Sequence, residues 1–237
     1  MAKLVFDIET SALSLDRFDD VQKEYLFRDA ERIPDPELRA ARHCEIQQML
    51  SLWPLTAQIV CIAMMNAETE RGQVLYVAEE AEAGNDDDAP VKFVACMDEA
   101  ELLAGFWDVA KRYETAITFN GRTFDVPFVY MRSALLNVRI SRKDWLGYRY
   151  QFDTHCDLAD QFTFYNGGRD GATRRFNLDF YCKAFGIESP KAKGITGMDI
   201  NQLVAQKRFR EIAEYCLRDV HATVALYKIC RDRLSSC

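Results

Sequence analysis

The sequence has few of the residues that build the commonest metal and disulfide sites. Three histidines occur in 237 residues, and the eight cysteines show no Cys-x-x-Cys spacing, so neither a zinc site nor a disulfide framework is predicted. No apolar run approaches the roughly 18 residues that a membrane-spanning helix needs. The first residues also lack the regions of a signal peptide. We therefore expect a cytoplasmic protein with reduced thiols and no membrane attachment.

The composition fits one α/β domain spanning residues 1–237, because 49% of the residues are hydrophobic and no repeat or low-complexity segment occurs. Strand-like segments gather early and helical ones later, which favours a mixed central β-sheet flanked by α-helices. The expected strands are residues 3–8, 57–65, 73–78 and 115–119, and the expected helices are residues 98–112, 125–136, 177–185, 199–206 and 208–234.

Residues 13–52 interrupt the expected pairing of the first two strands. They show helical spacing in two pieces, 16–30 and 36–50, and Pro36 suits a first helical turn. We interpret them as a helical insertion that covers a cleft, contacts a partner or only decorates the fold. Residues 79–90 and 166–171 are poor in core-forming side chains and are expected to be loops.

Charge is unevenly distributed along the chain. The net charge is −7 overall, with −13 over residues 1–119 and +6 over residues 120–237. This asymmetry indicates that the second half faces a polyanion, although ordinary solvated helix faces are the alternative. Lys191 and Lys193, in a loop rich in glycine and proline, are the best single candidates for phosphate contacts.

Four carboxylates and a tyrosine occur in three short motifs. Asp7 and Glu9 are two apart in the first strand and so share a face. Asp125 follows the strand at 115–119, and Tyr215 and Asp219 are four apart on one helix face. Converging carboxylates repel one another unless cations neutralise them, and oxygen ligands favour Mg²⁺ or Mn²⁺. Two such ions, about 4 Å apart, commonly promote phosphodiester hydrolysis, so the motifs predict a metal-dependent nuclease.

The order and spelling of these motifs resemble the DEDD superfamily of 3′–5′ exonucleases, and the Tyr-x-x-x-Asp form resembles its tyrosine subgroup. A closer resemblance is to the predicted 3′–5′ exonucleases related to the family B polymerase exonuclease domain. That resemblance implies a ribonuclease H-like fold. The segments that carry it are residues 119–128, 155–158, 177–179, 193–197 and 215–220.

The resemblance also implies a role for each residue of the three motifs. Asp7 bridges two divalent ions, Mg²⁺ or Mn²⁺; Glu9 and Asp219 complete one metal site, and Asp125 supports the other. Tyr215 orients the attacking water. Its ordinary pKa of roughly 10 makes it a poor base at neutral pH, so the ions must supply most of the acidification of that water. A tyrosine packed in the core is the structural alternative.

Four further residues are expected to contact the substrate. Asn120 and Phe124 would hold the terminal nucleotide, by an amide and a ring respectively, although Asn-Gly is also a turn dipeptide. Thr10 would position the 3′ end, and Leu13 would lie near the terminal base. His155 and Asp157 also resemble an element of the closer family, and their role stays open between the cleft and the core.

The expected activity is 3′–5′ hydrolysis of nucleic acid from single-stranded 3′ ends. Two alternatives on the same fold are a non-catalytic nucleic-acid-binding module and a hydrolase of short oligonucleotides. The binding module would need none of the four acids, whereas the hydrolase would need all of them. The sequence does not distinguish DNA from RNA, since recognition of the 2′-hydroxyl takes only one or two polar contacts. No polymerase segment is recognisable in the sequence, so a proofreading or repair role would require a separate polymerase or repair partner.

Overall fold

A mixed sheet of six strands forms the centre of the computed structural model, which describes residues 2–78, 89–147, 153–166, 173–190, 194 and 197–234. The strand order is β4-β3-β2-β1-β5-β6, and β1 pairs antiparallel with β2 and parallel with β5. The strands are β1 (Lys3–Ala12), β2 (Ala57–Asn66), β3 (Gly72–Val77), β4 (Val91–Cys96), β5 (Thr115–Thr118) and β6 (His155–Asp157). β1 therefore runs through the interior of the sheet.

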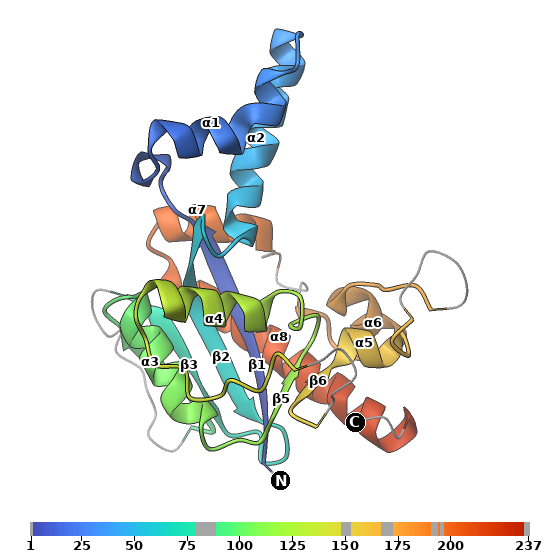
Figure 1. The fold of residues 1–237 in the computed structure, drawn as a ribbon. Coiled ribbons are helices and arrows are strands. Elements are labelled where there is room, and N and C mark those ends of the chain that lie inside the picture. The colour runs from blue at the N-terminus through green and yellow to red at the C-terminus, as the bar shows by residue number, and fades with distance from the viewer. Residues whose placement is uncertain are drawn as a thin grey trace.

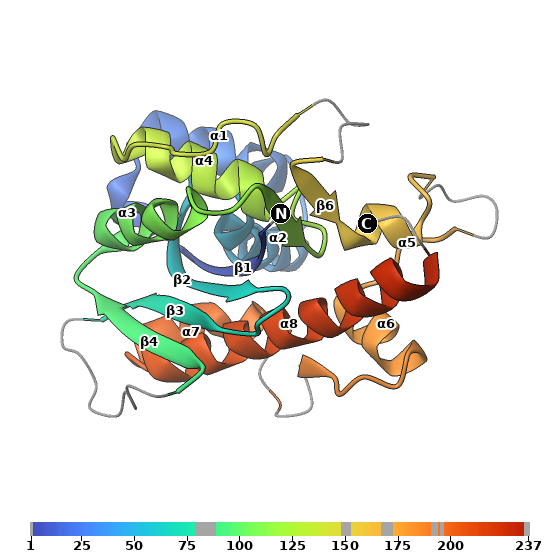
Figure 2. The same ribbon diagram turned by 90° about the horizontal axis from the view of Figure 1, so that it is seen from below.

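Helices cover both faces of this sheet (Figure 2). α3 (Glu99–Ala110) and α4 (Asp125–Leu135) lie on one face, and α8 (Phe209–Ile229) crosses the other together with α6 (Leu178–Ala184) and α7 (Ile200–Ala205). The remaining helices are α1 (Asp20–Glu31), α2 (Pro36–Met49) and α5 (Leu158–Phe162). The expected mixed sheet flanked by helices is therefore present. No described helix is both long and apolar enough to cross a membrane.

The alternation of β1 divides its side chains between two cores. Leu4, Phe6 and Ile8 are buried against α3 and α4. Val5 belongs to the core under α8. Because successive strand residues point to opposite faces, Asp7 continues the Val5 side of the strand. β1 therefore presents its acidic residues to the face that α8 covers.

The two helices expected within residues 13–52 are present, and they lie beyond the end of the sheet where β1 finishes (Figure 1). A capping box between Asp19 and Gln22 starts α1, and Asp35 caps α2. The helices share a small core of buried residues, made by Phe27, Ala30, Ile46 and Leu50. This core fixes how α2 is rotated about its own axis.

The structure adds three elements that the sequence did not predict, namely β4, β6 and α5. β6 is only three residues long, and β4 alternates exposed and half-buried positions at the edge of the sheet. The expected loop at 79–90 lies outside the described residues except for its last two positions, and that at 166–171 except for its first. The expected helix at 177–185 is α6, which begins after its Asn177 cap and is followed by Gly186 at φ 71°.

Candidate active site

β1 and α8 bring the first and third motifs together. Asp7 and Glu9 lie two residues apart on β1, and Cys216 faces them from α8. One potential ligand atom from each of these three side chains lies within 4.8 Å of the others. Glu9 is buried, with 7% of its surface exposed, whereas Asp7 is half-buried.

Asp125 contacts β1 along the edge of the strand that pairs with β5. Its Oδ1 accepts a hydrogen bond from the backbone N–H of Ile8 at 3.1 Å, and its side chain is buried. The pairing of β1 with β5 extends only from Lys3 to Val5, so the Ile8 N–H has no strand partner on that side. The carboxylate supplies the acceptor that the buried backbone group needs. Asp125 is therefore fixed beside both acids of β1.

Tyr215 and Asp219 complete the group from one face of α8. The Tyr215 hydroxyl donates a hydrogen bond to the Asp219 carboxylate, and both residues are buried. Burial, followed by the charge of Asp219, raises the pKa of Tyr215 well above its usual range. The hydroxyl consequently keeps its proton at neutral pH and acts as a hydrogen-bond donor rather than as a base.

Burial and neighbouring carboxylates raise the pKa values of Asp7, Glu9 and Asp125. The pKa of Asp7 is raised well above its usual range by burial first, and then by the charges of Asp125, Asp219 and Glu9. Burial and Asp219 raise the pKa of Glu9 in the same way. Burial is also the largest cause for Asp125, whose pKa rises to about 7. Such a group of buried carboxylates repels its own charge, which a divalent cation would neutralise, so the donor set fits Mg²⁺ or Mn²⁺.

Cys216 is the residue of this group that sequence reasoning missed, because a single cysteine in an apolar helical pattern is typical of a small core side chain. It is fully buried, but its Sγ also lies 3.4 Å from the backbone oxygen of Asp7 and 3.9 Å from Oδ2. Burial raises the pKa of its thiol well above the usual range, so the sulfur stays protonated and donates to Asp7. The only available signal was its place between Tyr215 and Asp219 in the third motif.

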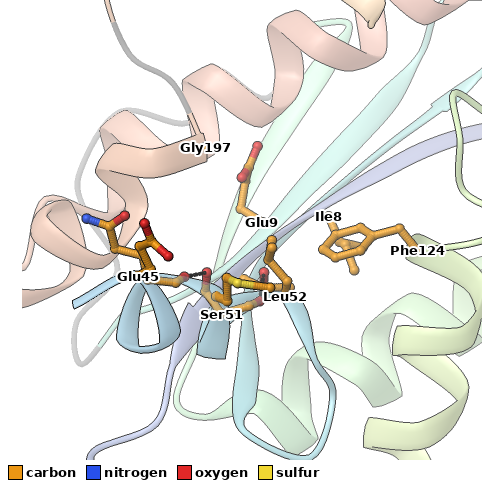
Figure 3. A pocket seen from close by; sticks show the side chains of 10 residues that line it. Ile8, Glu9, Glu45, Ser51, Leu52, Phe124 and Gly197 are labelled. Carbon is orange, nitrogen blue, oxygen red and sulfur yellow. Dashed lines mark hydrogen bonds between the residues drawn. The ribbon is translucent and has the colours of Figure 1, made fainter. Parts of the chain in front are cut away.

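Two cavities open on this cluster. One, of about 180 Å³, is lined by Asp7, Phe119, Asn177, Leu178, Asp179, Pro190, Tyr215 and Asp219. The other, of about 510 Å³, is lined by Ile8, Glu9, Thr10, Glu45, Gln48, Met49, Ser51, Leu52, Phe124 and Gly197 (Figure 3). Asp7 and Glu9 thus reach different cavities although they share one strand.

The structure separates the residues expected to contact substrate. Phe124 and Thr10 line the larger cavity, although the Thr10 hydroxyl is already bonded to the Ser51 carbonyl at 2.7 Å. Asn120 uses its side-chain oxygen to accept from Arg175 at 2.7 Å. Leu13 is half-buried beyond the end of β1 and is not among the described residues that line either cavity. Lys191 and Lys193 lie outside the described residues.

Asp157 organises the loop of the second motif. Its carboxylate accepts three backbone N–H groups, from Asn120 at 2.8 Å, Arg122 at 2.9 Å and Ala159 at 3.0 Å. The loop needs this support because Asn120 is left-handed at φ 66°. A Cβ at Gly121 would lie 2.5 Å from the Thr118 side chain. Asp157 therefore fixes the turn that leads to Asp125.

His155 lies behind the same loop. It is buried, and its Nε2 is 2.8 Å from the Thr118 hydroxyl. Burial lowers its pKa to about 3, so the imidazole is neutral at physiological pH. Of the two alternatives left open by the sequence, the core position is the one observed for His155.

Comparisons with known proteins bear on the fold and the family. DNA polymerase 1 of Saccharolobus solfataricus is 28% identical to the chain over 138 residues, and DNA polymerase 1 of Sulfolobus acidocaldarius is 30% identical over 139 residues. Each alignment covers 54% of this chain and 15% of the relative, so the chain spans a small part of these polymerases.

A family B DNA polymerase structure from the hyperthermophilic archaeon Pyrobaculum calidifontis matches the fold. The TM-score is 0.55 at 19% identity, and the match covers 96% of this chain and 24% of that chain. The fold is ribonuclease H-like, as the motif resemblance implied.

Residues 51–235 match the family described as predicted 3′–5′ exonucleases related to the exonuclease domain of PolB. The match begins near the end of the insertion, so it includes Asp125, Tyr215 and Asp219 but not Asp7 and Glu9. Asp7 and Glu9 are placed in the same cluster by their position beside Cys216, which lies within the match. The chain belongs to the family of predicted 3′–5′ exonucleases related to the exonuclease domain of PolB.

Proposed function

We propose that the protein is a 3′–5′ exonuclease that hydrolyses phosphodiester bonds at single-stranded 3′ ends with two divalent cations. The observation that carries the proposal is the convergence of Asp7, Glu9 and Asp125 at β1, where burial first, and then the charge of Asp219 among others, raises the pKa of each carboxyl. A binding surface for a polyanion has no use for four converging acids, whereas a metal-dependent hydrolase requires them.

Each residue has a distinct task in this proposal. Asp7 would bridge the two ions, Glu9 and Asp219 would complete one site, and Asp125 would support the other. The ions, when bound, would activate the attacking water and stabilise the departing 3′ oxygen. Tyr215 would orient that water through its hydroxyl, which is held by Asp219 and stays protonated. Phe124 would contact the terminal nucleotide at the larger cavity.

The biological setting belongs to the same proposal. We expect action in the cytoplasm on DNA or RNA, and proofreading or repair would need a polymerase or repair protein as a separate partner. The relatives are polymerases of which this chain matches 15%, so the proposal concerns hydrolysis alone.

The test is degradation of 5′-labelled single strands of DNA and RNA with Mg²⁺ or Mn²⁺, using wild type, Asp7→Asn and Asp108→Asn. Asp108 is an exposed acid of α3 and serves as the matched control. The expected result is a ladder of shortened products from wild type and Asp108→Asn but not from Asp7→Asn. Cleavage of very short oligomers alone would instead identify an oligonucleotide hydrolase, and binding without cleavage would identify a binding module.

A further inference from the structure

One side of α2 forms a wall of the larger cavity beside Glu9. Glu45, Gln48, Met49 and Leu52 all line this cavity. They are spaced at i, i+3, i+4 and i+7, which places them along one face of a helix. Leu52 lies in the short helical turn that directly follows α2. We call these four residues the α2 stripe.

The α2 stripe is held in place from behind. Ile46 and Leu50 point into the small core with Phe27 and Ala30, so the stripe faces away from that core. At the end of the stripe, the Ser51 carbonyl accepts from the Thr10 hydroxyl, and the Leu50 carbonyl accepts from Thr56 at 2.7 Å. The insertion is thereby fixed to the strand that carries Asp7 and Glu9.

The stripe exposes apolar side chains where a packed core would bury them. Leu52 is 50% exposed and Met49 is 36% exposed. Phe124, which is half-buried, lines the same cavity from the start of α4. In the view of Figure 3, Leu52 lies between Glu45 and Phe124, and Glu9 points into the space above them. A flat apolar ligand would be enclosed by the Phe124 ring and the side chains of Met49 and Leu52.

The charges of the cavity select which part of a nucleotide enters it. Glu9 and Glu45 bring carboxylates to its wall, and no lysine or arginine is among the described residues that line it. Arg42 pairs with Glu45 at 2.8 Å without being one of these residues. At the α2 side of the cavity a phosphate would therefore find no cationic side chain among the described lining residues, whereas a base offers amino and ring N–H groups that carboxylate and amide oxygens accept.

We propose that the α2 stripe binds the 3′-terminal nucleobase of the substrate, and that this is the function of the insertion. The proposal rests on the exonuclease function and specifies its substrate contact. The cavity volume of about 510 Å³ lies within the roughly 300–1,000 Å³ that enclose small ligands. A base whose edge contacts Gln48 and Glu45 cannot also pair with a complementary base, so a paired end must open first.

The test is a double-mutant cycle between the protein and the terminal base. Gln48→Ala and Leu52→Ala are compared with Gln47→Ala and Leu38→Ala, exposed residues of the same types on α2 outside the stripe. Each variant is given a single strand that ends in an ordinary nucleotide or in one lacking its base. Affinity is measured with Ca²⁺ and single-turnover cleavage with Mg²⁺ or Mn²⁺.

Compared with wild type, the stripe variants are expected to bind the strand with an ordinary 3′ end at least about fivefold more weakly. On the strand that lacks its terminal base, the variants and wild type should have the same affinity. The two controls should match wild type on both strands. An equal loss on both ends, or no loss on either, overturns the inference. If wild type binds but does not cleave, the exonuclease proposal fails while the affinity cycle still decides the base contact.

Discussion

Asp125 accepts the backbone N–H of Ile8, the residue that separates Asp7 from Glu9 on β1. A carboxylate from the second motif is therefore tied to the middle of the first. The donor to Asp125 is a backbone N–H, so among substitutions of Ile8 only proline would remove it. The relative position of three acids is thus set by one hydrogen bond together with the sheet.

Replacing an acid of the cluster should abolish turnover without unfolding the protein. Asp7→Ala and Asp219→Ala are expected to lower kcat by about 100-fold or more, because even the outer partners of metal ligands contribute 10–100-fold. Removing one charge also relieves repulsion among the remaining acids, so the metal-free variants should melt no lower than wild type. Calorimetry in EDTA and kinetics at saturating Mn²⁺ check this. Near-normal turnover in either variant would refute the assignment of that residue.

The stability of the metal-free protein should fall as pH rises toward neutrality. The pKa of Asp125 is raised to about 7 from 3.8, and those of Asp7 and Glu9 are raised as well. Between about pH 4 and pH 7 the folded state therefore binds more protons than the unfolded chain, and the free energy of unfolding decreases with pH. Mg²⁺ or Mn²⁺ should restore it by binding only the folded state.

The measurement is the melting temperature against pH in EDTA, for wild type and Asp125→Asn. Surface carboxylates with lowered pKa values, such as Glu70, act in the opposite direction. The difference in melting temperature between the two proteins isolates the contribution of Asp125. As pH rises, the melting temperature of Asp125→Asn should increase relative to that of wild type. A difference that stays constant across the range would contradict the prediction.

Tyr215→Phe should reduce turnover far more than affinity. The Tyr215 hydroxyl keeps its proton, so it can hold the attacking water by a hydrogen bond but cannot take a proton from it, and a misplaced reactant can cost about 100-fold in rate. Because Tyr215 does not titrate between pH 7 and pH 9, the wild-type rate should rise over that range as the attacking water ionises. Single-turnover cleavage across pH, with binding measured in Ca²⁺, tests both points. A rate that peaks near pH 6 would require a different general base.

Asp157→Asn should destabilise the protein and impair cleavage together. The variant retains one oxygen for three backbone N–H groups, so a loss of about 1–3 kcal/mol in the free energy of unfolding is expected. Asp153→Asn, an exposed acid of the same segment, is the control. Denaturant unfolding with both variants would show whether the carboxylate of Asp157 supports the loop, and equal stability would show that it does not.

Strand binding should weaken with salt despite the net negative charge. Lys191 and Lys193 lie outside the described residues, so their expected contacts with phosphate rest on the sequence. The double replacement by alanine should lower the salt slope of binding by about one for each lysine that contacts a phosphate. Lys92→Ala, on the edge strand β4, should leave the slope unchanged. An unchanged slope in the double variant would place the phosphate contacts elsewhere.

Local patterns were enough to predict which faces carry the acids. The spacing of two between Asp7 and Glu9, and of four between Tyr215 and Asp219, depends only on the geometry of a strand and a helix. The contacts of Cys216 with Asp7 and of Asp125 with Ile8 depend on how distant elements pack, which no local pattern encodes. β6 was missed because its three residues include polar His155 and Asp157, whose burial follows from tertiary hydrogen bonds.

The contact between Cys216 and Asp7 spans 209 residues of chain. On the ribosome, domains fold as their segments emerge, so β1 is made long before the helix that covers it. A nascent chain that lacks α8 carries Asp7 and Glu9 without Tyr215 or Asp219. If the protein is the nuclease proposed above, its activity arises only after α8 has been made. Nascent chains that lack α8 would then be harmless to the nucleic acid around them.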